Sequence, residues 1–181
     1  MTTFDPTTVR EYFNLIKTHV VRPLADTELS NSCYATLLML CGCIDGLGKL
    51  IHPRRNAGAG ERFKYFVSRM GPKYDAMKKE LWDLRNELAH NALNVVAYLS
   101  HVPETSSVHL QKSSSGTQFF VNTQQFFDDF VTAFKQLERD LSTDTTLQQI
   151  IQQRLTYCEI PANEFEEWET TPPPPIRFIQ N

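Results

Sequence analysis

The sequence predicts an all-α fold, a helical bundle into which one small β-hairpin is inserted. Apolar residues recur three and four positions apart over several long stretches, as on the buried face of a helix. Proline and glycine gather in the segments between those stretches, at 52–60 and 71–72. Residues 108–121 differ, because two short runs flank a turn rich in serine and glycine, which is the pattern of a hairpin.

The first predicted helix spans residues 7–23, with Pro6 just inside its start. A second, longer helix is expected over 34–51, following a cap at Asp26 or Thr27. Small residues in this second helix would let a neighbouring helix approach closely: Cys41, Gly42, Gly46 and Gly48.

The segment 52–60 is a predicted loop, and a short helix follows over 61–70. Gly71-Pro72 ends that helix, and the next one is expected to run from Tyr74 to about Tyr98. This fourth helix holds the residues of chemical interest.

The candidate hairpin pairs 108–111 with 118–121 around a turn at 113–116. A last long helix begins at Thr123, and a continuation covers 147–155. Its aromatic and leucine stripe is most simply core: Phe126, Phe130, Phe134, Leu137 and Leu141.

Length and composition indicate one domain. We assign residues 1–160 to a helical domain and 161–181 to a proline-rich extended tail, where Trp168 and the prolines at 172–175 interrupt the helical pattern. Hydrophobic residues make up 41% and charged residues 22% of the 181, which excludes wholesale disorder. A net charge of −3 provides no global basic field for nucleic acid, but it permits a local grip on one phosphate.

The sequence also bears on location and cofactors. Residues 1–6 lack the features of a signal peptide, and the apolar stretch 35–44 is too short to span a bilayer, so we expect a cytoplasmic protein with no membrane contact. The cysteines have no metal-ligand spacing and are expected to be buried thiols: Cys33, Cys41, Cys43 and Cys158. We expect neither a metal nor a cofactor.

Arg85 lies close to the apolar stripe of the fourth helix, where an unpaired charge is expensive. Its head must reach a carboxylate on another helix or a bound anion. Asp45, within the apolar run of the second helix, is the internal candidate, with Arg62 competing for it. The long stem also allows a third course, toward the flank that holds Asn86.

Asn86 and His90 are four positions apart, so their side chains are neighbours on one surface of the helix. Trp82 and Leu93 lie on the same flank and give a second subunit something apolar to bury.

Residues 81–91, with Arg85, Asn86 and His90 at the key positions, resemble the motif of the HEPN superfamily. In that motif an arginine, often beside a polar residue, precedes a histidine by four to six residues. Residues 60–66 are similar to a segment of uncharacterised bacterial members. The resemblance covers 34–141 in architecture and about a dozen residues in detail.

This resemblance implies a helical bundle that often dimerises and, in many members, acts as a metal-independent endoribonuclease. Arg85, Asn86 and His90 would be its active-site residues. Toxin members that are regulated by a partner nucleotidyltransferase often have a tyrosine two residues after the histidine, where this chain has Ala92. Regulation through that tyrosine is therefore not expected.

These residue types suit metal-free cleavage of RNA, which needs a base, an acid and a cation beside the phosphate. Histidine titrates near neutrality and serves either proton-transfer role, while arginine binds phosphate through a planar fork. One chain offers a single histidine in the motif, so a homodimer would supply acid and base together.

Another class of function stays open: a non-catalytic helical dimer that binds a nucleotide, RNA or a partner protein. In that case Arg85 forms a structural ion pair with Asp45, and His90 is a surface histidine. Arg54 and Arg55 fit a solvated loop better than an RNA groove, unless that loop neighbours the motif.

Overall fold

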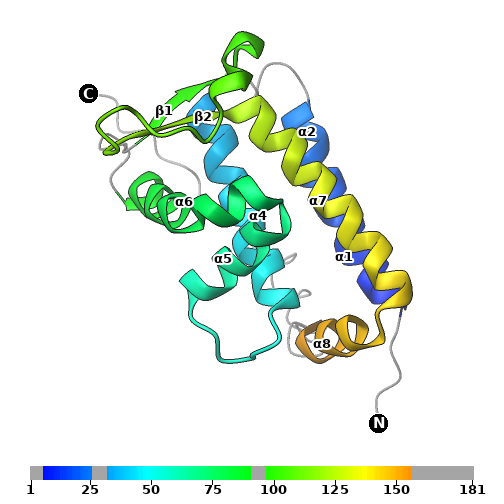
Figure 1. Cartoon of the computed structure of the whole chain (residues 1–181). Coiled ribbons are helices and arrows are strands. Elements are labelled where there is room, and N and C mark those ends of the chain that lie inside the picture. Colours follow the sequence, from blue (N-terminus) through cyan, green and yellow to red (C-terminus); the bar gives the residue numbers. More distant parts are fainter. Residues whose placement is uncertain (1–5, 26–31, 91–96, 156–181) are drawn as a thin grey trace, which may run out of the picture.

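The computed structural model describes residues 6–25, 32–90 and 97–155 (Figure 1). These residues form a mostly helical fold with a small β insertion, which confirms the predicted fold class. The proposed tail at 161–181 and the predicted caps at Asp26 and Thr27 lie outside the described residues.

The first predicted helix is observed as three consecutive helical segments, α1 (Pro6–Ile16), η1 (Lys17–Val21) and α2 (Arg22–Ala25). The middle segment is π-helical, and the Arg22 N–H bonds to the Lys17 carbonyl five residues back. Pro23 directly follows Arg22. It has no N–H to donate to the carbonyl four residues back, which favours such a change of hydrogen-bonding pattern.

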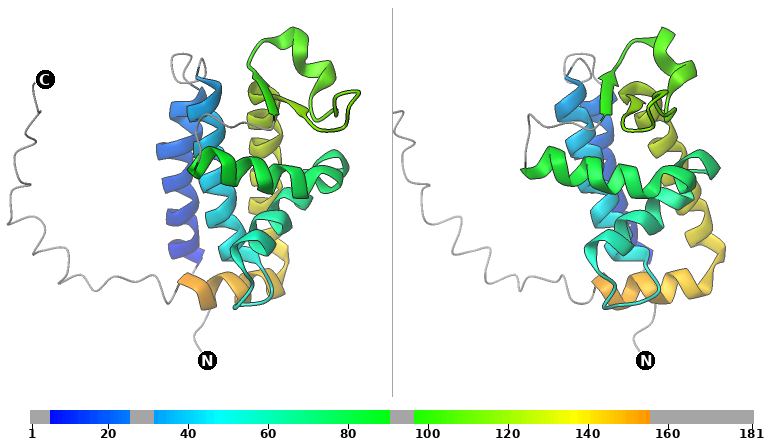
Figure 2. Two further views of the ribbon diagram at one scale, coloured as in Figure 1. Left: turned by 90° about the vertical axis from the view of Figure 1, so that its left-hand side faces the viewer. Right: turned by 60° about the vertical axis from the view of Figure 1, so that its left-hand side comes forward.

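The long helix α4 (Cys33–Ile51) is the centre of the core, with its N-terminus capped by Ser32. By length and composition it is apolar enough to cross a membrane, yet half of that stretch is buried inside the protein. Figure 2 shows α6 (Pro72–His90) crossing α4, and α8 (Thr145–Leu155) lying across the ends of α1 and α4.

The predicted aromatic stripe is confirmed on α7 (Thr123–Thr143), where Phe126, Phe130 and Phe134 are fully buried. Phe134 packs against Phe13 of α1 with ring centroids 5.0 Å apart. The two helices run side by side in Figure 1, so the N-terminal helix covers the same core.

Helices α4 and α5 (Ala59–Arg69) approach so closely that glycine is required at one position. A Cβ on Gly48 would lie 2.3 Å from the Arg62 carbonyl oxygen. The predicted role of small residues in the second helix is thus confirmed at Gly48. Gly42 differs, because a Cβ there would meet nothing within 4 Å.

The prediction that the fourth helix runs to about Tyr98 was wrong. Helix α6 ends at His90 in the described chain, and Ala97–Ser100 form strand β1. The apolar residues that lead into this strand fit a helical pattern by spacing alone. They include the β-branched Val95 and Val96, whose stiff side chains favour a strand.

Strand β1 pairs in parallel with β2 (Phe119–Asn122), in the register Ala97 to Phe119. The predicted second strand is therefore confirmed within one residue. The other half of the hairpin is not a regular strand, because Val108 closes the 3-10 helix η2 (Pro103–Val108). The segment after it still meets the far edge of β2 through an antiparallel bridge from Lys112 to Phe119.

The predicted turn at 113–116 is present, with the Gly116 N–H donating to the Ser113 carbonyl at 2.8 Å. Gly116 has φ +71°, a conformation that glycine adopts without steric cost. The insertion thus consists of β2 with a partner on each edge.

A buried polar chain fastens this insertion to the helices. The Asn122 N–H donates to Nδ1 of His109 at 3.1 Å, so that nitrogen carries no proton, and Nε2 must hold it if the ring is neutral. Nε2 lies 2.8 Å from the Tyr74 hydroxyl, which donates to Asp129 Oδ2 at 2.8 Å. The chain therefore links β2, α6 and α7.

Burial lowers the pKa of His109 to about 4; the nearby charge of Asp129 acts in the opposite direction, and that of Lys73 in the same one. Burial and the Asp129 carboxylate raise the pKa of the Tyr74 hydroxyl. At neutral pH the chain is a neutral imidazole and a neutral phenol ending on a carboxylate.

We expect Gly48→Ala to lower the free energy of unfolding by about 1–3 kcal/mol, because the added methyl group meets the backbone of α5. Gly42→Ala is the matched control in the same helix. It should raise the free energy of unfolding by about 0.5–1 kcal/mol, since alanine has a higher helix propensity than glycine and its methyl group meets no neighbour there. Urea unfolding measures both, and equal effects would contradict the close approach at Gly48.

Stability should depend on pH through His109. In the unfolded protein the His109 imidazole is protonated below about pH 6.5, whereas in the folded protein it stays neutral down to about pH 4. Over that interval the wild type should lose about 3 kcal/mol of unfolding free energy that His109→Gln does not lose. Parallel loss in both proteins during pH-dependent urea titrations would contradict the neutral, buried imidazole.

Candidate functional site

The guanidinium of Arg85 is fixed by Asp45 across the contact between α6 and α4. Nε and Nη2 both donate to Asp45 Oδ2, at 2.8 and 2.6 Å. Only 25% of the arginine side chain and 23% of the aspartate side chain are exposed. This confirms the predicted contact. Arg62, the expected competitor, makes no ion pair with a carboxylate of the described residues.

The Arg85 head also lies against the face of Trp82, with Cζ 5.3 Å from the ring centroid. The indole ring is seated over Gly60, where a Cβ would come within 3.1 Å of it. It also packs on Phe63, with ring centroids 5.5 Å apart. Trp82 is thus half-buried within its own chain, while Leu93, its predicted neighbour on that flank, lies outside the described residues.

A third contact joins Arg85 to Asn86, whose Oδ1 accepts from Nη1 at 3.3 Å. The guanidinium therefore follows two of the predicted courses at once, pairing with Asp45 and extending toward the Asn86 flank. Together with the stacking on Trp82, these two contacts leave the head group little freedom.

His90 is exposed at the end of α6 and makes no hydrogen bond or ion pair with any described residue. Five positions separate it from Arg85, which is about 140° around a helix. Within one chain the two side chains diverge. The structure therefore brings together Arg85, Asn86 and Asp45, and leaves His90 on a separate part of the surface.

Thiol chemistry is not available beside this cluster. Burial, and after it the charge of Asp45, raises the pKa of Cys41 to about 12. Burial raises the pKa of Cys43 to about 11. Because the thiolate is the nucleophile, both are inert near neutral pH. Cys41 is buried as predicted, Cys33 and Cys43 are partly buried, and Cys158 lies outside the described residues.

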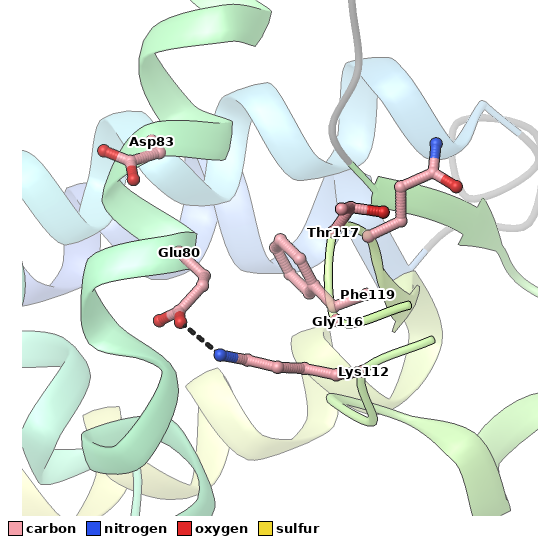
Figure 3. A pocket seen from close by; sticks show the side chains of 7 residues that line it. Glu80, Asp83, Lys112, Gly116, Thr117 and Phe119 are labelled. Carbon is pink, nitrogen blue, oxygen red and sulfur yellow. Dashed lines mark hydrogen bonds and ion pairs between the residues drawn. The ribbon is translucent and has the colours of Figure 1, made fainter. Parts of the chain in front are cut away.

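A shallow hollow of about 160 Å³ lies on a different face of α6, between Glu80 and Asp83 and the turn of the insertion (Figure 3). Lys112 closes one side by donating to Glu80 at 2.6 Å, and this contact lowers the pKa of the Glu80 carboxyl. Glu80 and Asp83 are about 140° and 160° around the helix from Arg85. The hollow therefore does not include the motif.

Within the part of the chain that the structure describes, no group of three or more His, Cys, Asp or Glu side chains could hold a metal ion. No family model, curated protein or solved structure matches the chain. The likeness to the HEPN motif therefore stays a prediction.

Two contributors to the site were not predicted. The stacking of Arg85 on Trp82 could have been inferred, because residues three apart are neighbours on a helix. The seat of the indole on Gly60 gave no signal, since nothing in the sequence pairs those two positions.

We expect Asp45→Asn to lower the free energy of unfolding by about 2 kcal/mol, because it leaves a largely buried guanidinium without its carboxylate. Asp83→Asn, on the same helix as Arg85, is the matched control. It removes only an exposed pair with Lys79 and should change stability by less than about 0.5 kcal/mol. Urea unfolding compares them; similar small effects would show that the Asp45 contact is dispensable.

Proposed function

We propose that this protein is a metal-independent endoribonuclease of the HEPN type, with a composite site in a homodimer. The supporting observation is one guanidinium, held rigidly by Asp45, Trp82 and Asn86, on the same helix that ends in the exposed His90. The chemistry follows from these residues.

Arg85 is suited to bind a phosphate because its position is fixed before any ligand arrives. Asp45 and Asn86 take up three of its N–H groups. A guanidinium has five, so two remain for phosphate oxygens. A donor that is already oriented does not need to be ordered during the reaction, which is the basis of electrostatic stabilisation of a transition state.

His90 supplies the proton transfers. One copy takes the proton of a ribose 2′-hydroxyl, whose oxygen forms a bond to phosphorus as the bond from phosphorus to the 5′-oxygen breaks. A second copy donates a proton to that leaving oxygen. The products are a 2′,3′-cyclic phosphate and a 5′-hydroxyl. An exposed imidazole is able to act in either role.

An exposed apolar stripe on α4 favours a second copy as the partner. Tyr34 and Leu38 are 43% and 46% exposed. Steps of four and seven residues place both on the same side of α4 as Asp45, so the stripe leads directly to the Arg85 ion pair. A twofold contact over this stripe would bury it and bring two motifs near one another.

One observation favours the alternative, a non-catalytic dimer that binds a nucleotide, RNA or a partner protein. Asp45 already neutralises Arg85, so the guanidinium does not require a bound anion. In that case Arg85 is a structural residue, and His90 contributes to ligand contact only.

His90→Ala should reduce cleavage of single-stranded RNA in the presence of EDTA by at least about 100-fold, since acid and base are both lost. The variant should fold normally, because the side chain makes no polar contact within the described residues. His19→Ala, another exposed histidine, is the control and should keep full activity.

The dimer is tested in the same assay with Leu38→Asp, which places a charge on the exposed stripe. It should halve the mass in solution and abolish cleavage with the helical signal unchanged. The composite site would be refuted if the wild type is a monomer in solution and the His90→Ala variant cleaves RNA at the wild-type rate. Absence of any cleavage by a dimeric wild type would favour the non-catalytic alternative.

A further inference from the structure

Arginines from three segments lie near the end of α4 that is remote from its Ser32 cap. Arg154 of α8 donates from Nη2 to the His52 carbonyl at 3.2 Å. The His52 N–H bonds to the Gly48 carbonyl one turn back, and Gly48 is the residue on which the Arg62 backbone of α5 packs. Arg55 follows His52 by three residues in the loop that leads into α5.

Two of these arginines, Arg62 and Arg154, are poorly compensated by the described residues. Nε of Arg154 is buried and has no hydrogen-bond partner among the described residues. Arg62 makes no ion pair with a described carboxylate, and the one acidic side chain of this loop region, Glu61, is held by Arg54. Burial, and then the charges of Arg55 and Arg62, lower the pKa of Arg154.

We propose that Arg55, Arg62 and Arg154 form a second anion-binding site, which takes a phosphate group of RNA or of a nucleotide. Three guanidiniums carried by separate segments suit a tetrahedral group with several charged oxygens better than a planar carboxylate. The inward Nε of Arg154 provides a donor for such an oxygen once the head group turns.

The position of this site deepens the proposed function. Asp45 and His52 are seven residues apart, so they lie on the same side of α4, about 10 Å along its axis. A single RNA strand bound by Arg85 would therefore continue to the arginines near His52. The second site would hold the strand at a phosphate other than the one that is cleaved. This role in cleavage rests on the proposed ribonuclease function, whereas the binding of an anion at the three arginines does not.

The test uses a fluorescent 2′-O-methyl RNA, which lacks the attacking hydroxyl and reports binding without cleavage. Arg62→Gln and Arg154→Gln should each weaken binding about tenfold, as expected for the loss of a charged hydrogen bond. Each should also reduce the slope of log K against log salt by about 0.7. Arg22→Gln, an exposed arginine on α2 at the opposite end of the bundle, should change neither value.

A nucleotide arm distinguishes the two sources of phosphate. If ATP raises the melting temperature of the wild type but not of Arg154→Gln, the site accepts a free nucleotide; if only RNA binding changes, it takes the backbone phosphate. Should Arg154→Gln fail to fold, Arg55→Gln replaces it, because Arg55 is an exposed residue of a loop and its substitution should not disturb folding. Unchanged RNA binding and unchanged ATP response in Arg55→Gln and Arg62→Gln would overturn the site.

This outcome is separate from that of the ribonuclease. Loss of binding in the arginine variants without any cleavage by the wild type would support the second site alone. Loss of cleavage in His90→Ala, with normal RNA binding by the arginine variants, would support the ribonuclease and reject the second site.

Discussion

The ion pair between Asp45 and Arg85 is the interaction on which the arrangement of the central helices depends. It places a carboxylate inside the apolar run of α4 and a guanidinium beside the apolar stripe of α6, and neither is tolerable without the other. Two glycine contacts pack α5 against these two helices. The backbone of α5 lies against Gly48 of α4, and the Trp82 ring of α6, which stacks on Arg85, lies against Gly60 of α5. Polar pairing and close packing therefore fix the same three helices.

The same interaction sets the terms of the functional proposal. A guanidinium that is held on three sides loses little freedom when it meets a phosphate, which favours catalysis. A guanidinium already paired with a carboxylate has less net charge to offer, which favours a structural role. His90 differs in both respects, because it is exposed and is not held by any described residue. Its function depends on what lies opposite, and the exposed stripe of Tyr34 and Leu38 suggests a second copy.

Much of the helical structure could be predicted because its signals are local. The beginning of α7 at Thr123, the turn at 113–116 and the Asp45 partner of Arg85 all followed from spacing, turn residues or the cost of an unpaired charge. Features that depend on distant segments could not. The parallel pairing of Ala97 with Phe119, the seat of Trp82 on Gly60 and the approach of Arg154 to His52 each join positions that no periodicity connects.

The parallel pair of β1 and β2 has a consequence for the order of folding. Helical contacts form between near neighbours in the chain, whereas Ala97 meets Phe119 only after the whole intervening segment has closed into a loop. We therefore expect the helices to assemble first and the strands to dock afterwards. Such a late-forming unit is also the first to open in the native state, so its amides should exchange with solvent deuterium sooner than those of α4.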